Sequence, residues 1–235
     1  MTYADLTGIP IARGGTAGMW NGAANTKQVI VVHDTESGTA AGALSWMRSQ
    51  QNGSYHLLVD TDGDVVRMVP DSRQAWAAMT TGNRIGLHLC ATGFASYRLS
   101  IRRAARRAMP RSMRTRRYDG ICEHRGGRRA GGRWADYPAL LDEMARQLAT
   151  WSTEYGIPLV ALNAAQVRAG QRGVCGHAEI SGAFRESDHT DPGTALIPLI
   201  LPRAQAIAAG STNLLGMTTA ELAEAATNLR QLGPT

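Results

Sequence analysis

The sequence has almost no lysine: Lys27 is the only one, against 24 arginines in 235 residues. Only three cysteines are present, and none of them forms the CxxC spacing of a metal or redox site. Such an odd, small number argues against a disulfide scaffold and is typical of a protein made in a reducing cytoplasm. One disulfide with one free thiol stays open as the alternative.

Long apolar runs are missing as well. No stretch approaches the ~18 to 20 apolar residues of a membrane span, and the N-terminus lacks the basic start and apolar stretch of a secretory signal. We therefore expect no membrane insertion and a cytoplasmic location. The hydrophobic content of 43% and charged content of 19% are ordinary for a globular protein.

The net charge of +6 comes from one segment. Between residues 97 and 133 there are thirteen arginines and two acids, so the remaining 12 basic and 17 acidic residues leave the rest of the chain at −5. Residues 98–133 lack apolar periodicity and suggest a solvated, partly disordered insert. A polyanion-binding arm and an out-of-frame translation of a GC-rich gene are the alternatives. Because no nucleic-acid motif is present, we expect no specific nucleic-acid partner.

Apolar patterning predicts an α/β domain with a mixed central sheet flanked by helices. The predicted elements are a strand at 29–32, a helix at 40–49, a hairpin at 54–70 around Asp62-Gly63, a strand at 85–90, a helix at 138–156 and an extended segment at 157–162. We expect an N-terminal extension at 1–27, the domain at 28–200 with the insert at 98–133, and a C-terminal linker and helix at 201–235.

The segment 176–193, GHAEISGAFRESDHTDPG, has two histidines, four acids and three glycines in eighteen residues. It shows no clean helical or alternating period, which predicts a loop. Five of the six histidines fall in this segment or at strand ends: His33, His56, His88, His177 and His189.

Three of these side chains could form a metal site. Zinc hydrolases use three protein ligands and lower the pKa of a bound water to ~7, and His33 could meet His177 and Asp191 in this way. The spacing is neither HExxH nor a zinc-finger pattern, however. From the residues alone, hydrogen-bonded structural histidines at strand ends are an equally open interpretation.

Five sequence blocks in order are VIVVHDTESGT, GSYHLLVDTDGDVVRMVPDSRQAWAA, GNRIGLHLC, GVCGHAEIS and DHTDPG. Together they resemble the type-2 N-acetylmuramoyl-L-alanine amidases, a family that includes amidase modules of bacteriophage lysins and the peptidoglycan-recognition proteins. The resemblance covers residues 28–96 and about 134–193.

This resemblance implies a hydrolase with one Zn²⁺ per chain that cleaves the amide between N-acetylmuramic acid and L-alanine of peptidoglycan. It places the metal ligands at His33, His177 and Asp191. Tyr55 falls where the family has a tyrosine near the metal-bound water. His189 falls where relatives commonly have a lysine, and a cation there would stabilise the oxyanion, a contribution of ~3 kcal/mol in comparable sites.

One position departs from the family pattern. Relatives often have a glutamate able to act as general base where this chain has His88, so either His88 accepts the proton or another group does. Asp34 and Glu179 are candidate hydrogen-bond acceptors for the ligand histidines, with solvated surface acids as the alternative. His56 should face away from Tyr55 by strand alternation and be structural.

Two further interpretations concern neighbouring side chains. Cys175 is more typical of a packing residue than of a ligand. Trp46 and Trp76 could line a substrate cleft or pack in the core.

The resemblance implies the lytic module of a phage or prophage endolysin, a monomer held in the cytoplasm until host lysis and then acting on the cell wall. A non-catalytic peptidoglycan-binding module of the same fold is the alternative. Relatives that lose activity replace the third ligand, so the intact Asp191 favours the enzyme. A decayed gene product is a third possibility, because the insert lies where relatives run directly towards the long helix.

If His88 and His189 take part in proton transfer, the hydrolysis rate changes between about pH 6.5 and about pH 8.5, because a histidine with an unperturbed pKa near 6.5 loses its charge around this range. A histidine in place of lysine at position 189 predicts a sharp loss of rate on the alkaline side. Peptidoglycan hydrolysis that stays constant over this range would remove both histidines from the mechanism.

Overall fold

The computed structural model describes residues 3–5, 20–50, 52–93 and 134–210. The arginine-rich segment 98–133 and the helix expected near the C-terminus lie outside these residues. Within them, a six-stranded sheet has the order β1-β5-β4-β7-β3-β8. Its strands are β1 (Tyr3–Asp5), β3 (Val29–Asp34), β4 (Leu57–Val59), β5 (Val65–Arg67), β7 (Gly86–Ala91) and β8 (Gly173–Gly176).

The sheet is mixed, as the sequence predicts. Only β4 and β5 pair in antiparallel fashion, as a hairpin in which Gly63 takes φ +88°, and the other neighbouring strands are parallel. A glycine takes this left-handed conformation without the steric cost that a side chain adds. The expected hairpin around Asp62-Gly63 is therefore confirmed.

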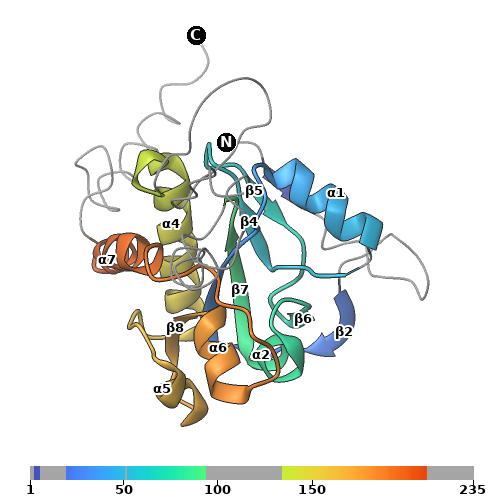
Figure 1. Cartoon of the computed structure of the whole chain (residues 1–235). Helices are drawn as coiled ribbons and strands as arrows, with labels where there is room; N and C mark the ends of the chain where they lie inside the picture. The colour runs from blue at the N-terminus through green and yellow to red at the C-terminus, as the bar shows by residue number, and fades with distance from the viewer. Residues whose placement is uncertain (1–2, 6–19, 51, 94–133, 211–235) are drawn as a thin grey trace, which may run out of the picture.

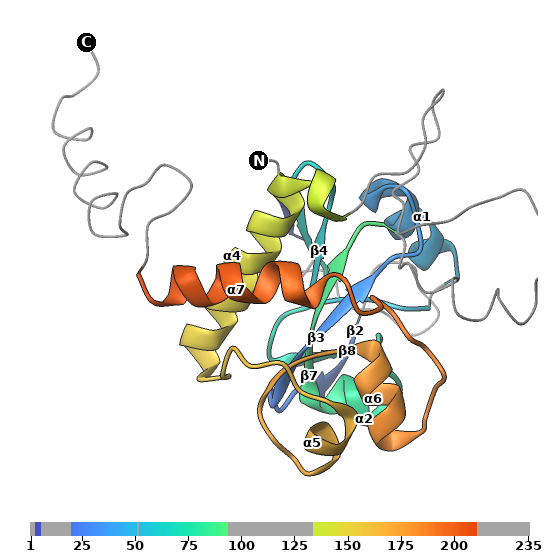
Figure 2. The ribbon, with the colours of Figure 1, turned by 60° about the vertical axis from the view of Figure 1, so that its left-hand side comes forward.

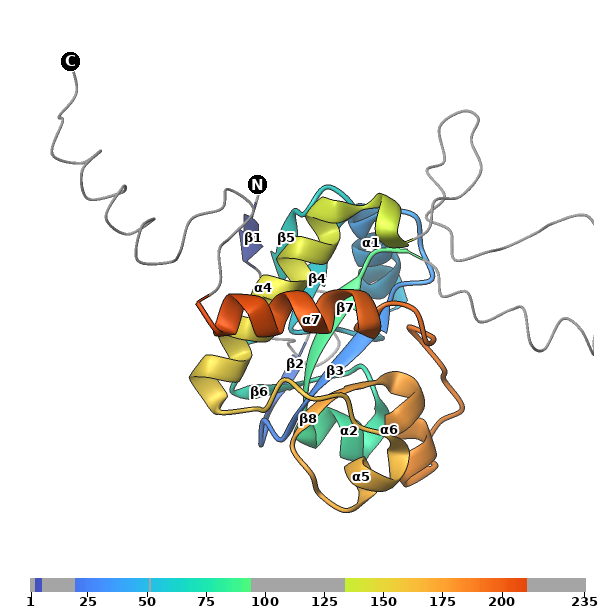
Figure 3. The same ribbon diagram turned by 90° about the vertical axis from the view of Figure 1, so that its left-hand side faces the viewer.

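Helices cover both faces of the sheet (Figure 1). The helices are α1 (Ala40–Gln50), α2 (Met79–Ile85), α4 (Pro138–Tyr155), α5 (Ala164–Arg168), α6 (His177–Phe184) and α7 (Ile197–Ala208). A short 3₁₀ turn, η2 (Trp134–Asp136), precedes α4. Figures 2 and 3 show α7 crossing α4 on one side of the sheet, with α1 on the other side.

Successive side chains of a strand point to opposite faces of the sheet, so the core is divided into clusters on the two faces. Ile30 and Val32 of β3 belong to a buried cluster with α4 and α7. Val29 and Val31 point the other way, into a cluster that includes residues of α5 and α6. His33 comes two residues after Val31 on the same strand. Its side chain therefore lies on the same face of the sheet as that of Val31, away from α4.

Helix α4 is the helix that the sequence predicts most clearly. Pro138 occupies its first turn, and Gly156 follows its end with φ +63°. Leu140, Leu141 and Leu148 are fully buried against the sheet. The predicted strands at 29–32 and 85–90 and the helix at 40–49 are also present, with boundaries shifted by one or two residues.

The prediction that 176–193 is a loop is wrong for its first half, because α6 begins at His177. Gly176 precedes the helix, and its N–H donates to the Glu179 carboxylate at 2.8 Å. The buried residues of α6 are His177, Ile180, Ser181 and Ala183, and the first three have the helical spacing i, i+3, i+4. Because two of the four are polar, hydropathy alone conceals this period.

Regular structure is also present beyond residues 28 and 200. Strand β2 (Trp20–Ala24) pairs with β6 (Arg73–Ala75), although residues 1–27 were expected to form an extension. Helix α7 crosses the expected boundary at residue 200 and packs against α4. No helix in the described ranges is both long and apolar enough to span a membrane.

Leu148→Ala should lower the free energy of unfolding by about 2–5 kcal/mol, because it leaves a cavity between α4 and the sheet. Urea denaturation followed by circular dichroism measures this change. Val160→Ala is the matched control: Val160 is 48% exposed, so its loss should change stability by less than about 0.5 kcal/mol. Equal effects of the two substitutions would contradict the burial of α4.

Candidate metal centre

The parallel pairing of β3 with β8 brings two histidines together. Val32 lies opposite Gly176 in the register, so the next residue on each chain, His33 and His177, emerges at the same edge of the sheet. This edge is the carboxyl end of neighbouring parallel strands, where open α/β sheets bind their ligands. The chain returns after α6, and the carbonyl of Asp191 accepts a hydrogen bond from Ala178 N–H at 3.3 Å.

The Asp191 carboxylate lies between the two imidazoles. Its Oδ2 is 2.9 Å from His33 Nδ1, and its Oδ1 is 3.0 Å from His177 Nδ1. One ligand atom from each of the three residues lies within 4.8 Å of the others. His33, His177 and Asp191 could therefore hold a metal ion.

The protonation states also suit a metal. Burial lowers the pKa of His33, although the hydrogen bond from its ring to Asp191 opposes this shift. Burial alone would raise the pKa of Asp191, but hydrogen bonds with His177 and His33 hold it well below its usual range. A neutral imidazole and an ionised carboxylate are the forms that bind metals.

The second nitrogen of each of these two histidines also has a partner. His33 Nε2 lies 3.0 Å from Nδ1 of His88, and His177 Nε2 lies 3.4 Å from the Ser187 hydroxyl. Ser187 in turn hydrogen bonds to Ser181 at 2.7 Å. Sequence reasoning missed Ser187, because no spacing rule singles out a serine in the ESDH segment.

The two acids expected to support the ligand histidines make other contacts. Asp34 is buried, and its Oδ1 accepts a hydrogen bond from Glu36 N–H at 2.9 Å. Glu179 accepts from Gly176 N–H and so caps α6. These bonds orient the chain on either side of the site: Asp34 directly follows His33, and Gly176 directly precedes His177.

Two candidate catalytic side chains adjoin the three possible ligands. The Tyr55 ring centroid is 5.2 Å from that of His33, and burial raises the pKa of the phenol well above 10, so it stays protonated. The ring of His189 stacks on His177 with centroids 4.7 Å apart, and its Nδ1 is 3.8 Å from Asp191 Oδ1. The His189 side chain is 65% exposed and so remains accessible to a substrate.

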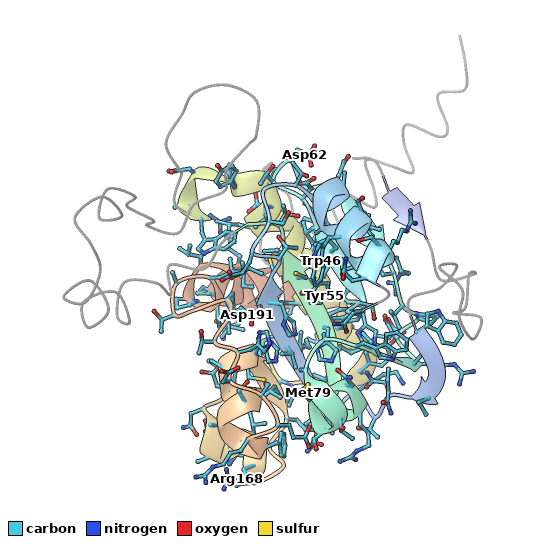
Figure 4. All side chains as sticks on the ribbon, turned by 45° about the vertical axis from the view of Figure 1, so that its right-hand side comes forward. Trp46, Tyr55, Asp62, Met79, Arg168 and Asp191 are labelled. Atoms are coloured by element: carbon cyan, nitrogen blue, oxygen red, sulfur yellow. The ribbon has the colours of Figure 1, made fainter. Side chains whose placement is uncertain are left out.

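A cavity of about 520 Å³ adjoins Tyr55. Figure 4 shows Trp46 of α1 next to Tyr55, with Asp191 to their lower left. Trp46 is 59% exposed, although tryptophan is usually mostly buried. The lining consists of Thr35, Glu36, Ser37, Gly42, Ala43, Trp46, Met47 and Tyr55, and thus excludes the half-buried Trp76.

His56 and Cys175 are buried in structural surroundings. The His56 ring bonds to the Arg73 carbonyl at 2.9 Å and accepts a hydrogen bond from His88 N–H at 2.9 Å. Cys175 is 1% exposed and packs in the cluster beneath α6. Neither residue is among the three that bring ligand atoms together.

The family model for N-acetylmuramoyl-L-alanine amidases matches residues 23–194, which include all three possible metal ligands. The chain belongs to this family. The resemblance noted in the sequence blocks is confirmed. A comparison with curated proteins gives no match.

Two solved structures share the amidase fold. The Staphylococcus aureus hydrolase AmiA, solved with its ligand, aligns with a TM-score of 0.54 and 17% identity over 88% of this chain and 84% of its own. The Ph2119 endolysin of a Thermus scotoductus bacteriophage aligns with a TM-score of 0.50 and 15% identity, over 86% of this chain and 98% of its own.

The buried histidines predict that the metal-free amidase loses stability in acid. Burial lowers the pKa of His56 from 6.5 to about 4, and it also lowers the pKa values of His33 and His88. As the pH falls below about 6.5 the unfolded chain takes up protons that the folded chain resists. The titration of His56 alone should lower the free energy of unfolding by about 3 kcal/mol between about pH 7 and about pH 4.

Urea unfolding at a series of pH values, with a chelator present, checks this loss. A free energy of unfolding that is equal at about pH 7 and about pH 4 would contradict the burial of these rings as neutral imidazoles.

Proposed function

We propose that this amidase hydrolyses the amide between N-acetylmuramic acid and L-alanine with one zinc ion bound by His33, His177 and Asp191. The observation that carries the proposal is the convergence of these side chains, 158 residues apart at their extremes, on one edge of the sheet. Two imidazoles and one carboxylate form a ligand set found in catalytic zinc sites, which leave a fourth position open.

Bound zinc supplies Lewis acidity, which activates water for attack on the amide carbonyl at neutral pH. The chain's own residues keep the ligands in the required forms: His33 is neutral because it is buried, and Asp191 is ionised because two histidines hydrogen bond to it. Neither ligand has to change its net charge at neutral pH to bind the metal, although His33 would have to carry its ring proton on Nε2 and not on Nδ1.

In this proposal, Tyr55 and His189 act on the substrate. The protonated Tyr55 hydroxyl donates a hydrogen bond to the substrate, from a ring that adjoins both His33 and the cavity. His189, exposed beside His177, stabilises the negative charge that develops on the carbonyl oxygen. The cavity beneath the exposed Trp46 accommodates part of the muropeptide.

The proposal extends to the biological role. Peptidoglycan is the partner of the family, and the bacteriophage protein Ph2119, an endolysin by its description, shares the fold. We assign this chain a lytic role of the same kind, in which it waits in the cytoplasm until lysis and then acts on the cell wall as a monomer.

Asp191→Ala should abolish both zinc binding and hydrolysis. Loss of one of three ligands should reduce peptidoglycan hydrolysis by at least about 100-fold. Elemental analysis of the purified protein gives the zinc content, and mass spectrometry of digested peptidoglycan shows the release of stem peptides. A chelator added to the wild-type protein should have the same effect as the substitution.

Val160→Ala, on the surface, is the control and should retain wild-type zinc content and activity. Wild-type protein that is loaded with zinc and binds peptidoglycan, yet releases no stem peptides, would favour the non-catalytic binding module. Full activity of Asp191→Ala in the presence of a chelator would contradict the metal mechanism itself.

A further inference from the structure

His88 is fully buried in the middle of β7, in the central part of the sheet. It lies opposite Val31 in the register, two residues before His33 on β3. Its Nδ1 is 3.0 Å from His33 Nε2, on the side of the His33 ring opposite to the Nδ1 that meets Asp191. His88 therefore contacts the metal centre through His33.

We infer that His88 is a positioning residue that orients the His33 ring for the metal by accepting a hydrogen bond from His33 Nε2–H. The inference rests on the proposed zinc site. It also assigns His88 a role different from general base, the role open to the glutamate that relatives often have at this position.

The hydrogen-bond geometry supports this role. When His33 binds a metal through Nδ1, the proton of its neutral ring must be on Nε2. That N–H needs an acceptor in a buried site, and Nδ1 of His88 lies at hydrogen-bond distance from it. Ligand histidines commonly hold such a partner on their second nitrogen, which sets the tautomer and the orientation of the ring.

The surroundings of His88 prevent it from reaching a substrate. Its ring stacks on His56 with centroids 5.6 Å apart and an angle of 13° between the planes. Its backbone N–H donates to His56 Nδ1, and the His56 ring bonds to the Arg73 carbonyl. Held in this way, His88 has no exposed surface and does not line the cavity beside Tyr55.

Substitution by asparagine separates positioning from proton transfer. The Oδ1 of asparagine takes approximately the place of imidazole Nδ1 and accepts a hydrogen bond, but an amide does not accept a proton at neutral pH. If His88 positions His33, His88→Asn should bind zinc and hydrolyse peptidoglycan within about fivefold of wild type. Outer partners of this kind are worth about 10- to 100-fold in metal affinity, so His88→Ala should weaken zinc binding by that factor.

Zinc affinity is measured by competition with a chromophoric chelator, and hydrolysis is measured separately at saturating zinc. Leu87→Ala is the matched control, because Leu87 is equally buried on the same strand but points into the cluster beneath α4. It should lower stability and leave zinc affinity unchanged. Thermal melts of all variants without metal show which of them fold.

Several results would overturn the inference. If His88→Asn and His88→Ala both bind zinc like the wild type but lose most of kcat, then His88 is a general base. If Leu87→Ala weakens zinc binding as much as His88→Ala, the effect is one of general stability. If His88→Ala does not fold, the result for His88→Asn tests the inference by itself. A His88→Asn protein that folds but loses zinc affinity or activity would then contradict the positioning role. A wild-type protein that binds no zinc would contradict the proposed function instead.

Discussion

The pairing of β3 with β8 is the constraint on which the metal centre depends. Parallel strands bring their carboxyl ends to one edge, and the register places Gly176 beside Val32, directly before the two histidines. A cross-strand slip of one residue would turn one imidazole to the opposite face of the sheet. Gly176 also suits the close approach here, since a Cβ on it would lie 2.9 Å from the Glu179 carboxylate and 3.0 Å from Pro192.

Burial gives His33 its chemical character. In water, imidazole titrates near neutral pH, but the interior of the sheet favours the uncharged ring. Asp191 has the opposite preference, because two N–H donors stabilise its charge more than burial disfavours it. Opposed shifts of this kind cluster at functional sites, and they give a metal a ligand set that is ready at neutral pH. The same burial costs stability when the pH falls.

Much of the fold could be predicted from local sequence patterns. The run VIVV predicts a strand that is buried on both faces, and the leucine spacing of α4 predicts a helix with one apolar face. Helix α6 could not be predicted in this way, because its buried face contains a metal-ligand candidate and a serine. Helix α2, with a glycine and an asparagine among its seven residues, has weak intrinsic helix propensity and was missed too.

The three possible ligands were predicted through family resemblance, since their spacing alone left the metal site undecided. Their contacts depend on tertiary structure that no local pattern encodes. The bond between His33 and His88 joins neighbouring strands 55 residues apart, and Ser187 reaches His177 only because the chain turns back after α6. Asp34 and Glu179, chosen for their proximity in sequence, each accept a hydrogen bond from a backbone N–H.

The distance along the chain between His33 and Asp191, 158 residues, has a consequence beyond chemistry. An ion bound by both ends would act as a reversible cross-link that closes most of the domain into one loop. Such a closure reduces the conformational entropy of the unfolded chain, and binding free energy becomes folding free energy. Scarcity of the metal would thus deprive the protein of its reactivity and of part of its resistance to proteases at the same time.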